Sequence, residues 1–247
     1  LKDSGARVIL CFDQLLPVVR AVREDCALRH VLATSLSELR PAQPSIPVPD
    51  LLLAAKVSGD DFLDFYAALA ACTAAAPTHR VQLDDLAALN YTGGTTGLPK
   101  GCMHSHRDML YTCASFVPTA LGLDRDSVLL NFLPEFWIAG ENAGLLFLVF
   151  AGCRLVLLAR WDALAFMAAV QHYRVSHCGL LVDSAAEVLD HPHVGDYDLR
   201  SLQRTGSISF IKKLTRDYRA RWQALSGCRL FEFSFGMTET HTCDTFT

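Results

Sequence analysis

Short runs of β-forming apolar residues alternate with helix-like segments along almost the whole chain. The first two runs are residues 6–12 and 30–33, and the segment between them starts at Asp13, a good helix-capping residue, and continues with apolar residues at helical spacing. A strand, a helix and a second strand in this order form a βαβ unit, whose strands lie parallel in one sheet. The sequence therefore predicts an α/β fold with largely parallel sheets and flanking helices.

Two breaks divide this alternation. Residues 35–49 contain four prolines and predict a surface connection, and residues 77–85 follow a predicted alanine-rich helix at 61–76. We therefore expect one βαβ region at residues 1–80, which includes the proline-rich connection, and a second region at residues 81–247. In the second region the pattern predicts strands at 86–91, 128–133, 155–159, 175–181 and 230–233, and helices at 107–121, 141–150, 162–173, 184–189 and 210–224.

The composition excludes several classes of protein. With 51% hydrophobic and 19% charged residues, the 247-residue chain is too apolar for an intrinsically disordered protein. Its formal net charge of -4 leaves no basic excess for a nucleic-acid partner. The longest apolar run covers only residues 143–153, whereas a transmembrane helix needs about 20 apolar residues. Nine cysteines without a C-x-x-C pair indicate free thiols, so we expect a cytoplasmic protein.

Residues 91–100 concentrate the residue types that bind anions. They hold three glycines, three threonines and one lysine, directly after the predicted strand 86–91. Glycines let backbone N–H groups approach an anion closely, and the hydroxyl and ammonium groups add donors, so the pattern predicts a phosphate-binding loop. It is neither a Walker A loop nor a G-x-G-x-x-G motif, and an ordinary glycine-rich turn remains the alternative. The candidate phosphate-binding residues are Thr92, Gly93, Gly94, Thr95, Thr96, Gly97 and Lys100.

Several segments resemble one enzyme family. TGGTTGLPKG at residues 92–101, followed by His104 and His106, closely resembles the signature loop of the adenylate-forming superfamily, which includes acyl-CoA synthetases, aryl-CoA ligases, luciferases and peptide-synthetase adenylation domains. FSFGMTET at residues 233–240 resembles its Y-G-x-T-E motif, with Phe235 in place of tyrosine. LPEFWIAG at residues 133–140 and DSGARVIL at residues 3–10 resemble two further segments, in the family's order. The resemblance covers essentially the whole chain.

The resemblance implies an ATP-dependent acid–thiol ligase. Such an enzyme converts a carboxylic acid and Mg-ATP to an acyl-adenylate, and coenzyme A then displaces AMP. The loop would hold the β- and γ-phosphates, Glu239 would coordinate Mg²⁺, and Thr238 would donate a hydrogen bond to a phosphate oxygen. The predicted catalytic residues are therefore Thr238, Glu239 and Lys100.

The resemblance also assigns the remaining nucleotide contacts. Phe235, with Gly236 beside it, would lie against the adenine, because a phenyl ring still stacks without the phenol. Gly206 and Ser207 would belong to a strand-end turn that lines the adenine pocket, at the place of the family's G-G-A-P segment. Of these positions in the turn, Gly206 is the one that matches outright.

The acid-binding pocket is expected around Trp137, Gly140 and Met237. Trp137 replaces the family's common histidine and cannot act as an acid or base; an ordinary core aromatic is the alternative. Amino-acid-activating relatives carry an aspartate near this segment, whereas Glu135 is the one acidic residue here, which favours a plain carboxylic acid. A fatty or aryl acid, with fatty preferred, fits the apolar neighbours, although core packing explains them equally well. These neighbours are Phe132, Phe136, Trp137, Ile138 and Met237.

Two polar clusters have less specific interpretations. His104 and His106 could suggest a metal site, but two histidines without a third ligand are more typical of polar surface or supporting residues. The basic residues between 212 and 221 favour a solvated helix face, and contact with a phosphate of coenzyme A or with an anionic membrane surface is the alternative.

The family resemblance implies a protein about twice as long as this chain. We therefore expect a piece of the large N-terminal domain, without the small C-terminal lid domain, that is inactive by itself and associates into a homodimer or larger species through exposed apolar surface. Two alternatives remain open: a non-catalytic nucleotide-binding module of the same fold, and an unrelated α/β structural domain.

Overall fold

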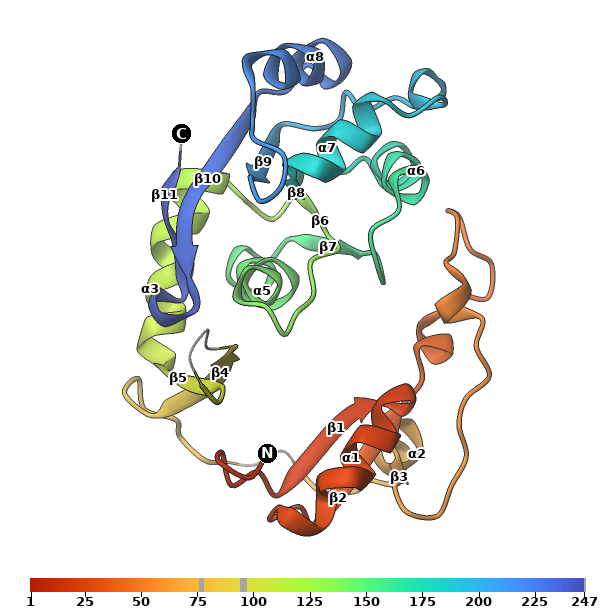
Figure 1. The fold of residues 1–247 in the computed structure, drawn as a ribbon, viewed down its shortest axis with the longest axis vertical. Coiled ribbons are helices and arrows are strands. Elements are labelled where there is room, and N and C mark those ends of the chain that lie inside the picture. Colours follow the sequence, from red (N-terminus) through yellow and green to blue (C-terminus); the bar gives the residue numbers. More distant parts are fainter. Residues whose placement is uncertain (76–77, 94–96, 247) are drawn as a thin grey trace. The chain divides into compact units, whose positions relative to one another are not determined.

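The computed structural model describes residues 1–75, 78–93 and 97–246. The chain divides into two compact units, one of Leu1–Pro44 and Val48–Val81 and the other of Ser45–Pro47 and Gln82–Thr247 (Figure 1). The division at residue 82 lies close to the boundary expected from the sequence. Both units combine helices with parallel strands, so the predicted α/β class is confirmed.

The first unit contains the predicted βαβ arrangement. Its three-stranded sheet has the order β1-β2-β3 and all pairs are parallel. Helix α1 packs Leu16 and Val19 against Val31 and Ala33 of the sheet, and these four side chains form a small buried core. The elements are β1 Val8–Phe12, α1 Leu16–Val22, β2 His30–Thr34, β3 Leu63–Asp64 and α2 Phe65–Ala70.

The predicted helix at 61–76 is wrong in length. Asp64 belongs to the short strand β3, and its carboxylate accepts a hydrogen bond from the backbone N–H of Ala67, so helix α2 begins only at Phe65. Asp61 lies outside the helix and forms a two-point ion pair with Arg20. The helix ends at Ala70, because alanines alone offer little apolar surface to pack.

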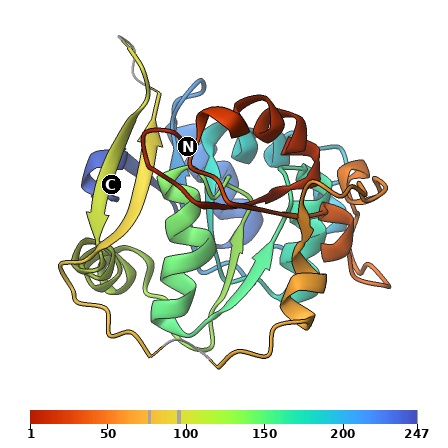
Figure 2. The same cartoon turned by 90° about the horizontal axis from the view of Figure 1, so that it is seen from below.

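The second unit contains a six-stranded sheet of order β11-β10-β9-β8-β6-β7, in which only β10 and β11 pair antiparallel. Strands β4 and β5 form a separate antiparallel pair, seen side by side in Figure 2. The strands are β4 Leu86–Thr92, β5 Lys100–Ser105, β6 Val128–Asn131, β7 Arg154–Leu157, β8 His177–Leu181, β9 Arg204–Ile208, β10 Leu230–Met237 and β11 Thr242–Phe246.

Helices cover both faces of the large sheet (Figure 1). On one face α6, α7 and α8 bury the main core, in which Phe166 and Trp222 are fully enclosed. On the other face Phe116 of α3 and Phe147 of α5 pack against Leu129 of β6. The helices are α3 His106–Phe116, α4 Ile138–Glu141, α5 Phe147–Ala151, α6 Ala163–Tyr173, α7 Val182–Leu189 and α8 Arg216–Ser226, with π-helical turns η5 at Val117–Leu121 and η6 at Asn142–Leu146.

Strands β5, β9 and β11 were not expected from the sequence. Their residues are polar or glycine-containing and show no clear alternation, so pairing with a neighbouring strand decides their conformation. Helix α8 is also shorter than predicted, because Thr215 caps it by accepting a hydrogen bond from Tyr218. Lys212 and Lys213 therefore lie in the loop before α8 and not on a helical face.

In the described part of the chain, no helix is long and apolar enough to cross a membrane.

Candidate active site

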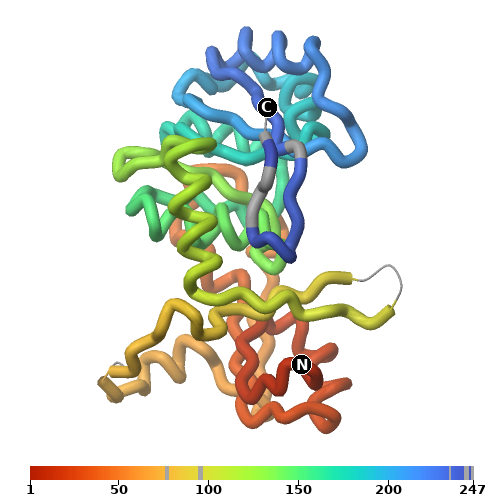
Figure 3. Tube along the Cα trace, turned by 90° about the vertical axis from the view of Figure 1, so that its left-hand side faces the viewer, coloured from red at the N-terminus to blue at the C-terminus, as the bar shows by residue number. Residues whose placement is uncertain are grey.

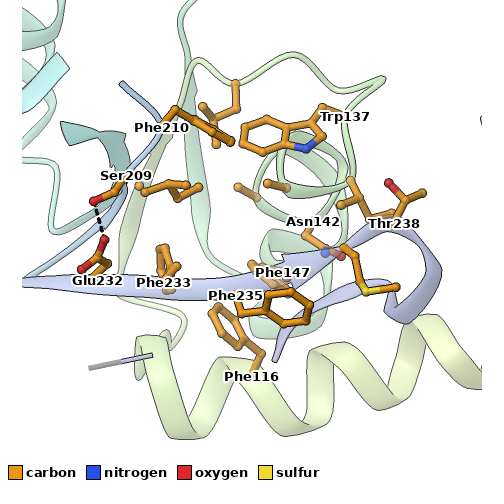
Figure 4. A pocket seen from close by; sticks show the side chains of 18 of the residues that line it. Phe116, Trp137, Asn142, Phe147, Ser209, Phe210, Glu232, Phe233, Phe235 and Thr238 are labelled. Atoms are coloured by element: carbon orange, nitrogen blue, oxygen red, sulfur yellow. Dashed lines mark hydrogen bonds between the residues drawn. The ribbon is translucent and has the colours of Figure 1, made fainter. Parts of the chain in front are cut away.

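A pocket of about 680 Å³ lies on the α3–α5 face of the large sheet (Figure 4). Most of the side chains that line it are apolar, and several of them are aromatic. Phe116 and Phe147 stack with ring centres 5.4 Å apart and planes inclined by 22°, and Trp137 and Phe210 meet at 5.8 Å. Such walls bury an apolar ligand group favourably, and the residues come from helices, loops and strand ends around the sheet.

Polar groups gather at one part of the same pocket. Thr92 and Gly93 at the end of β4, Lys100 at the start of β5, and Thr238 and Glu239 after β10 all line it. Strand β10 runs toward β5 and ends in the hairpin turn that joins it to β11, as Figure 3 shows. This turn places residues 238–239 beside the β4–β5 pair. A cation, hydroxyls and a carboxylate around one concavity can bind an anion together with a divalent metal ion.

The turn at residues 238–240 contacts strand β5, and the thiol of Cys102 lies on that strand. Burial, and after it the carboxylate of Glu239, raises the pKa of this thiol. Thr92, Gly93 and Lys100 of the glycine–threonine segment therefore line the same pocket as Glu239.

The pocket contains most of the predicted site residues that the structure describes. Gly97 is exposed and Gly140 lies within helix α4, and neither is among the described residues that line the pocket. Gly94, Thr95 and Thr96 lie outside the described residues. The predicted residues that line the pocket are Thr92, Gly93, Lys100, Trp137, Phe235, Gly236, Met237, Thr238 and Glu239.

The position predicted for the strand-end turn is wrong. Gly206 and Ser207 lie inside strand β9, where Ser207 donates a hydrogen bond to the carbonyl of Phe231, and neither is among the described pocket residues. The strand ends after Ile208, so Ile208 with the next two residues forms the wall. The polar sequence of β9 hid this strand and shifted the predicted turn by several residues.

Gly140 allows close packing of the backbone at helix α4. A Cβ atom at this position would overlap with the backbone carbonyl of Pro134, so only glycine lets the turn before α4 approach the helix this closely. Two of the apolar neighbours expected at the pocket also lie elsewhere. Phe132 is buried against Trp161, with ring centres 4.7 Å apart, and Phe136 is 88% exposed.

Sequence reasoning missed several polar and aromatic pocket residues. The hydroxyl of Ser209 donates a hydrogen bond to the carboxylate of Glu232, and both side chains line the wall (Figure 4). Asn142 lines the pocket from the turn η6 and donates through Nδ2 to the carbonyl of His241 at 3.0 Å. None of these residues belongs to a recognisable motif, so only the register of β9 against β10 could have identified the first two.

Comparison with known proteins assigns the family. Residues 1–247 match the family model described as AMP-binding enzyme. This chain belongs to the AMP-binding enzyme family. The resemblance inferred from its motifs is thereby confirmed.

Several relatives and solved structures are similar to this AMP-binding enzyme. 4-Coumarate–CoA ligase 2 from Nicotiana tabacum is 31% identical over 168 residues, 66% of this chain and 30% of that protein. 4-Coumarate–CoA ligase 1 from Narcissus pseudonarcissus is 33% identical, also over 168 residues that make up 66% of this chain and 30% of that protein. The chain thus spans less than a third of these relatives.

Solved structures share the fold. The anthranilate CoA ligase AuaEII, in complex with anthranoyl-AMP, matches 98% of this chain and 43% of its own with a TM-score of 0.78 at 20% identity. A putative long-chain-fatty-acid CoA ligase from Rhodopseudomonas palustris matches 100% of this chain and 55% of its own with a TM-score of 0.77 at 19% identity.

Beside the polar part of the pocket, this AMP-binding enzyme buries two histidines against each other. The rings of His104 on β5 and His241 after Glu239 meet edge to face with centres 4.6 Å apart. Both side chains are buried, and in the described part of the chain neither ring nitrogen of His241 has a hydrogen-bond partner. Burial, and after it the neighbouring His104, lowers the pKa of His241 to about 4. The carboxylate of Asp108 partly offsets the effect on His241.

The free energy of unfolding should therefore fall as the pH is lowered from about 6.5 to 4. An unfolded histidine titrates near pH 6.5, so between these values the unfolded chain binds a proton that folded His241 does not. The expected loss is about 3 kcal/mol, from the difference between the two pKa values. Urea denaturation at several pH values measures it. His241→Asn, which tolerates the left-handed backbone at φ 58°, should flatten the dependence, and an unchanged slope would contradict the assignment.

The two weaker polar clusters have local surroundings that the structure describes. Among the residues that the structure describes, no group of three or more His, Cys, Asp and Glu side chains is arranged to hold a metal ion. Two arginines of the basic segment are engaged locally: Arg221 pairs with Asp190, and Arg219 donates to the carbonyl of Leu230. These two side chains therefore link helix α8 to the strand and the loop beside it.

Proposed function

We propose that this chain is the nucleotide- and acid-binding part of an ATP-dependent acid–CoA ligase. The observation that supports this most strongly is the shared pocket, in which Lys100 and Glu239 lie at a polar part and aromatic side chains form the other walls. Such a ligase joins a carboxylate oxygen to the α-phosphorus of ATP and releases pyrophosphate. The thiol of coenzyme A then attacks the acyl carbon and releases AMP.

The polar residues divide the nucleotide chemistry between them. Lys100 places a positive charge where the β- and γ-phosphates would lie, and Thr92 and Thr238 add hydroxyl donors. The carboxylate of Glu239 suits Mg²⁺, which prefers oxygen ligands and is usually held by one or two carboxylates together with substrate phosphates. Bound there, Mg²⁺ would screen the charge of the phosphates.

The acid is proposed to be apolar. The aromatic side chains in its walls offer no positive charge for a second carboxylate; they include Phe116 of α3, Phe147 of α5, Phe233 of β10 and Trp137. The 4-coumarate–CoA ligases among the relatives and the aromatic walls favour an aryl acid, and a fatty acid is the second candidate. Glu232, which lies in the wall, disfavours an acid whose far end carries a negative charge.

Two measurements test the proposal together. Calorimetry of the chain with Mg-ATP should detect nucleotide binding, and ATP–pyrophosphate exchange by the longer polypeptide that contains this chain should depend on an added apolar acid. A panel of hydroxycinnamic, benzoic and straight-chain acids distinguishes the aryl from the fatty candidate. Nucleotide binding without exchange for any acid would favour the non-catalytic module, and no nucleotide binding would refute the proposal.

A further inference from the structure

Strands β8 and β9 present a strip without side chains to the pocket. Gly179 of β8 and Gly206 of β9 are direct partners in the parallel register. Since both lack a Cβ atom, the sheet surface is lower here than beside it. The ring of Phe233, from the adjacent strand β10, lies over this strip.

The contact between the ring and Gly206 is very close. A Cβ atom on Gly206 would overlap with Cε2 and Cζ of Phe233, whereas a Cβ atom on Gly179 would lie 3.9 Å from the ring, an ordinary contact distance. Gly179 lines the pocket and Gly206 is not among its described lining residues, because the ring lies between Gly206 and the pocket. Phe233 therefore forms the pocket floor over β9.

Other aromatic rings hold Phe233 in this place. Its ring centre lies 5.5 Å from that of Phe116 and 5.0 Å from that of Phe231, with the second pair edge to face. These contacts come from helix α3 and from the same strand, so the ring is held from two sides. A side chain packed in this way cannot move aside for a ligand without losing both contacts.

We propose that Phe233 determines how deep an acid can enter the pocket, and hence that it is a specificity-determining residue of this enzyme. The proposal rests on the proposed function, since it assumes that the apolar walls bind the acid. Without the ring, the floor would drop to the glycine strip, and no neighbouring side chain of β8 or β9 could fill the space. Longer or bulkier acids would then fit, while the polar part at Lys100 and Glu239 would be unchanged.

The test compares the longer polypeptide that contains this chain, as the parent protein, with three single-residue variants of it. All four are assayed on one series of straight-chain and aryl acids of increasing length. Phe233→Ala should shift the preference toward longer acids by about tenfold per added methylene at the new limit, since one methylene in an apolar pocket changes selectivity by about 10- to 200-fold. Gly206→Ala should act in the opposite direction, because its Cβ atom would push the ring into the pocket. The preference is measured as kcat/KM in acid-dependent pyrophosphate exchange, with direct acid binding as a second readout.

Phe132→Ala is the matched control. It removes a buried phenylalanine of the same unit, but Phe132 packs against Trp161 and is not among the described residues that line the pocket, so the ranking of acids should stay as in the parent protein. Thermal unfolding of each variant separates loss of packing from altered selectivity. If Phe233→Ala is too unstable to assay, Phe233→Leu should shift the preference in the same direction by a smaller factor.

The outcomes separate the inference from the function on which it rests. Acid-dependent exchange with the same ranking of acids in Phe233→Ala and the parent protein would overturn the role of Phe233 alone. A change in ATP affinity without a change in the ranking would also overturn it, because the ring would then border the nucleotide. Exchange with no acid of the series in the parent protein would refute the proposed function, and the inference with it.

Discussion

Glu239→Gln should lower acid-dependent pyrophosphate exchange by about 100-fold or more, the size of effect expected when a group that stabilises transition-state charge is lost. The amide keeps the shape of the side chain but removes the negative charge that would hold Mg²⁺ beside the phosphates. Because Glu239 is on the pocket wall after β10 and is largely exposed to solvent, the substitution should leave the thermal stability unchanged.

The dependence on Mg²⁺ distinguishes loss of the metal ligand from general damage. The variant should require a higher Mg²⁺ concentration for half-maximal exchange, whereas a misfolded protein would lose activity at every concentration. Glu24→Gln, an equivalent change at an exposed position of the first unit, is the control and should behave as the parent protein. A normal Mg²⁺ dependence in Glu239→Gln would contradict the assigned role.

Lys100→Ala should weaken the binding of Mg-ATP by about 10- to 100-fold. A hydrogen bond to a charged group contributes about 1.5–3 kcal/mol, and this lysine would supply both the donor and the opposite charge for a phosphate. Isothermal titration calorimetry of the chain measures the affinity directly. The difference between parent and variant should shrink at high salt, because the pocket is open to solvent at this position.

Lys213→Ala is the matched control for this measurement. Lys213 is also an exposed lysine, but it lies in the loop before α8 and is not among the described residues that line the pocket. Its removal should leave the affinity for Mg-ATP unchanged. Equal affinities in the Lys100→Ala and parent proteins would remove the phosphate-binding role, and equal losses in both lysine variants would indicate only a general charge effect.

Local sequence determined the elements whose residues carry their own pattern. Strand β6, helix α6 with its cap at Asp162, and strand β8 were predicted close to their observed limits, because apolar periodicity and capping are properties of neighbouring residues. The glycine–threonine segment and the motif at 235–239 were recognisable for a similar reason, since each concentrates unusual residue types in a short stretch. These motifs were sufficient to predict the family and one shared pocket.

Only the tertiary structure decided which distant side chains meet. The ring of Phe233 over Gly206, the bond between Ser209 and Glu232, and the buried contact of His104 with His241 depend on strand register and on the return of β10 toward β5. Strands β5, β9 and β11 were hidden for the same reason, because their conformation comes from hydrogen bonds to neighbouring strands. Such pairings join residues far apart in the chain, so no local periodicity records them.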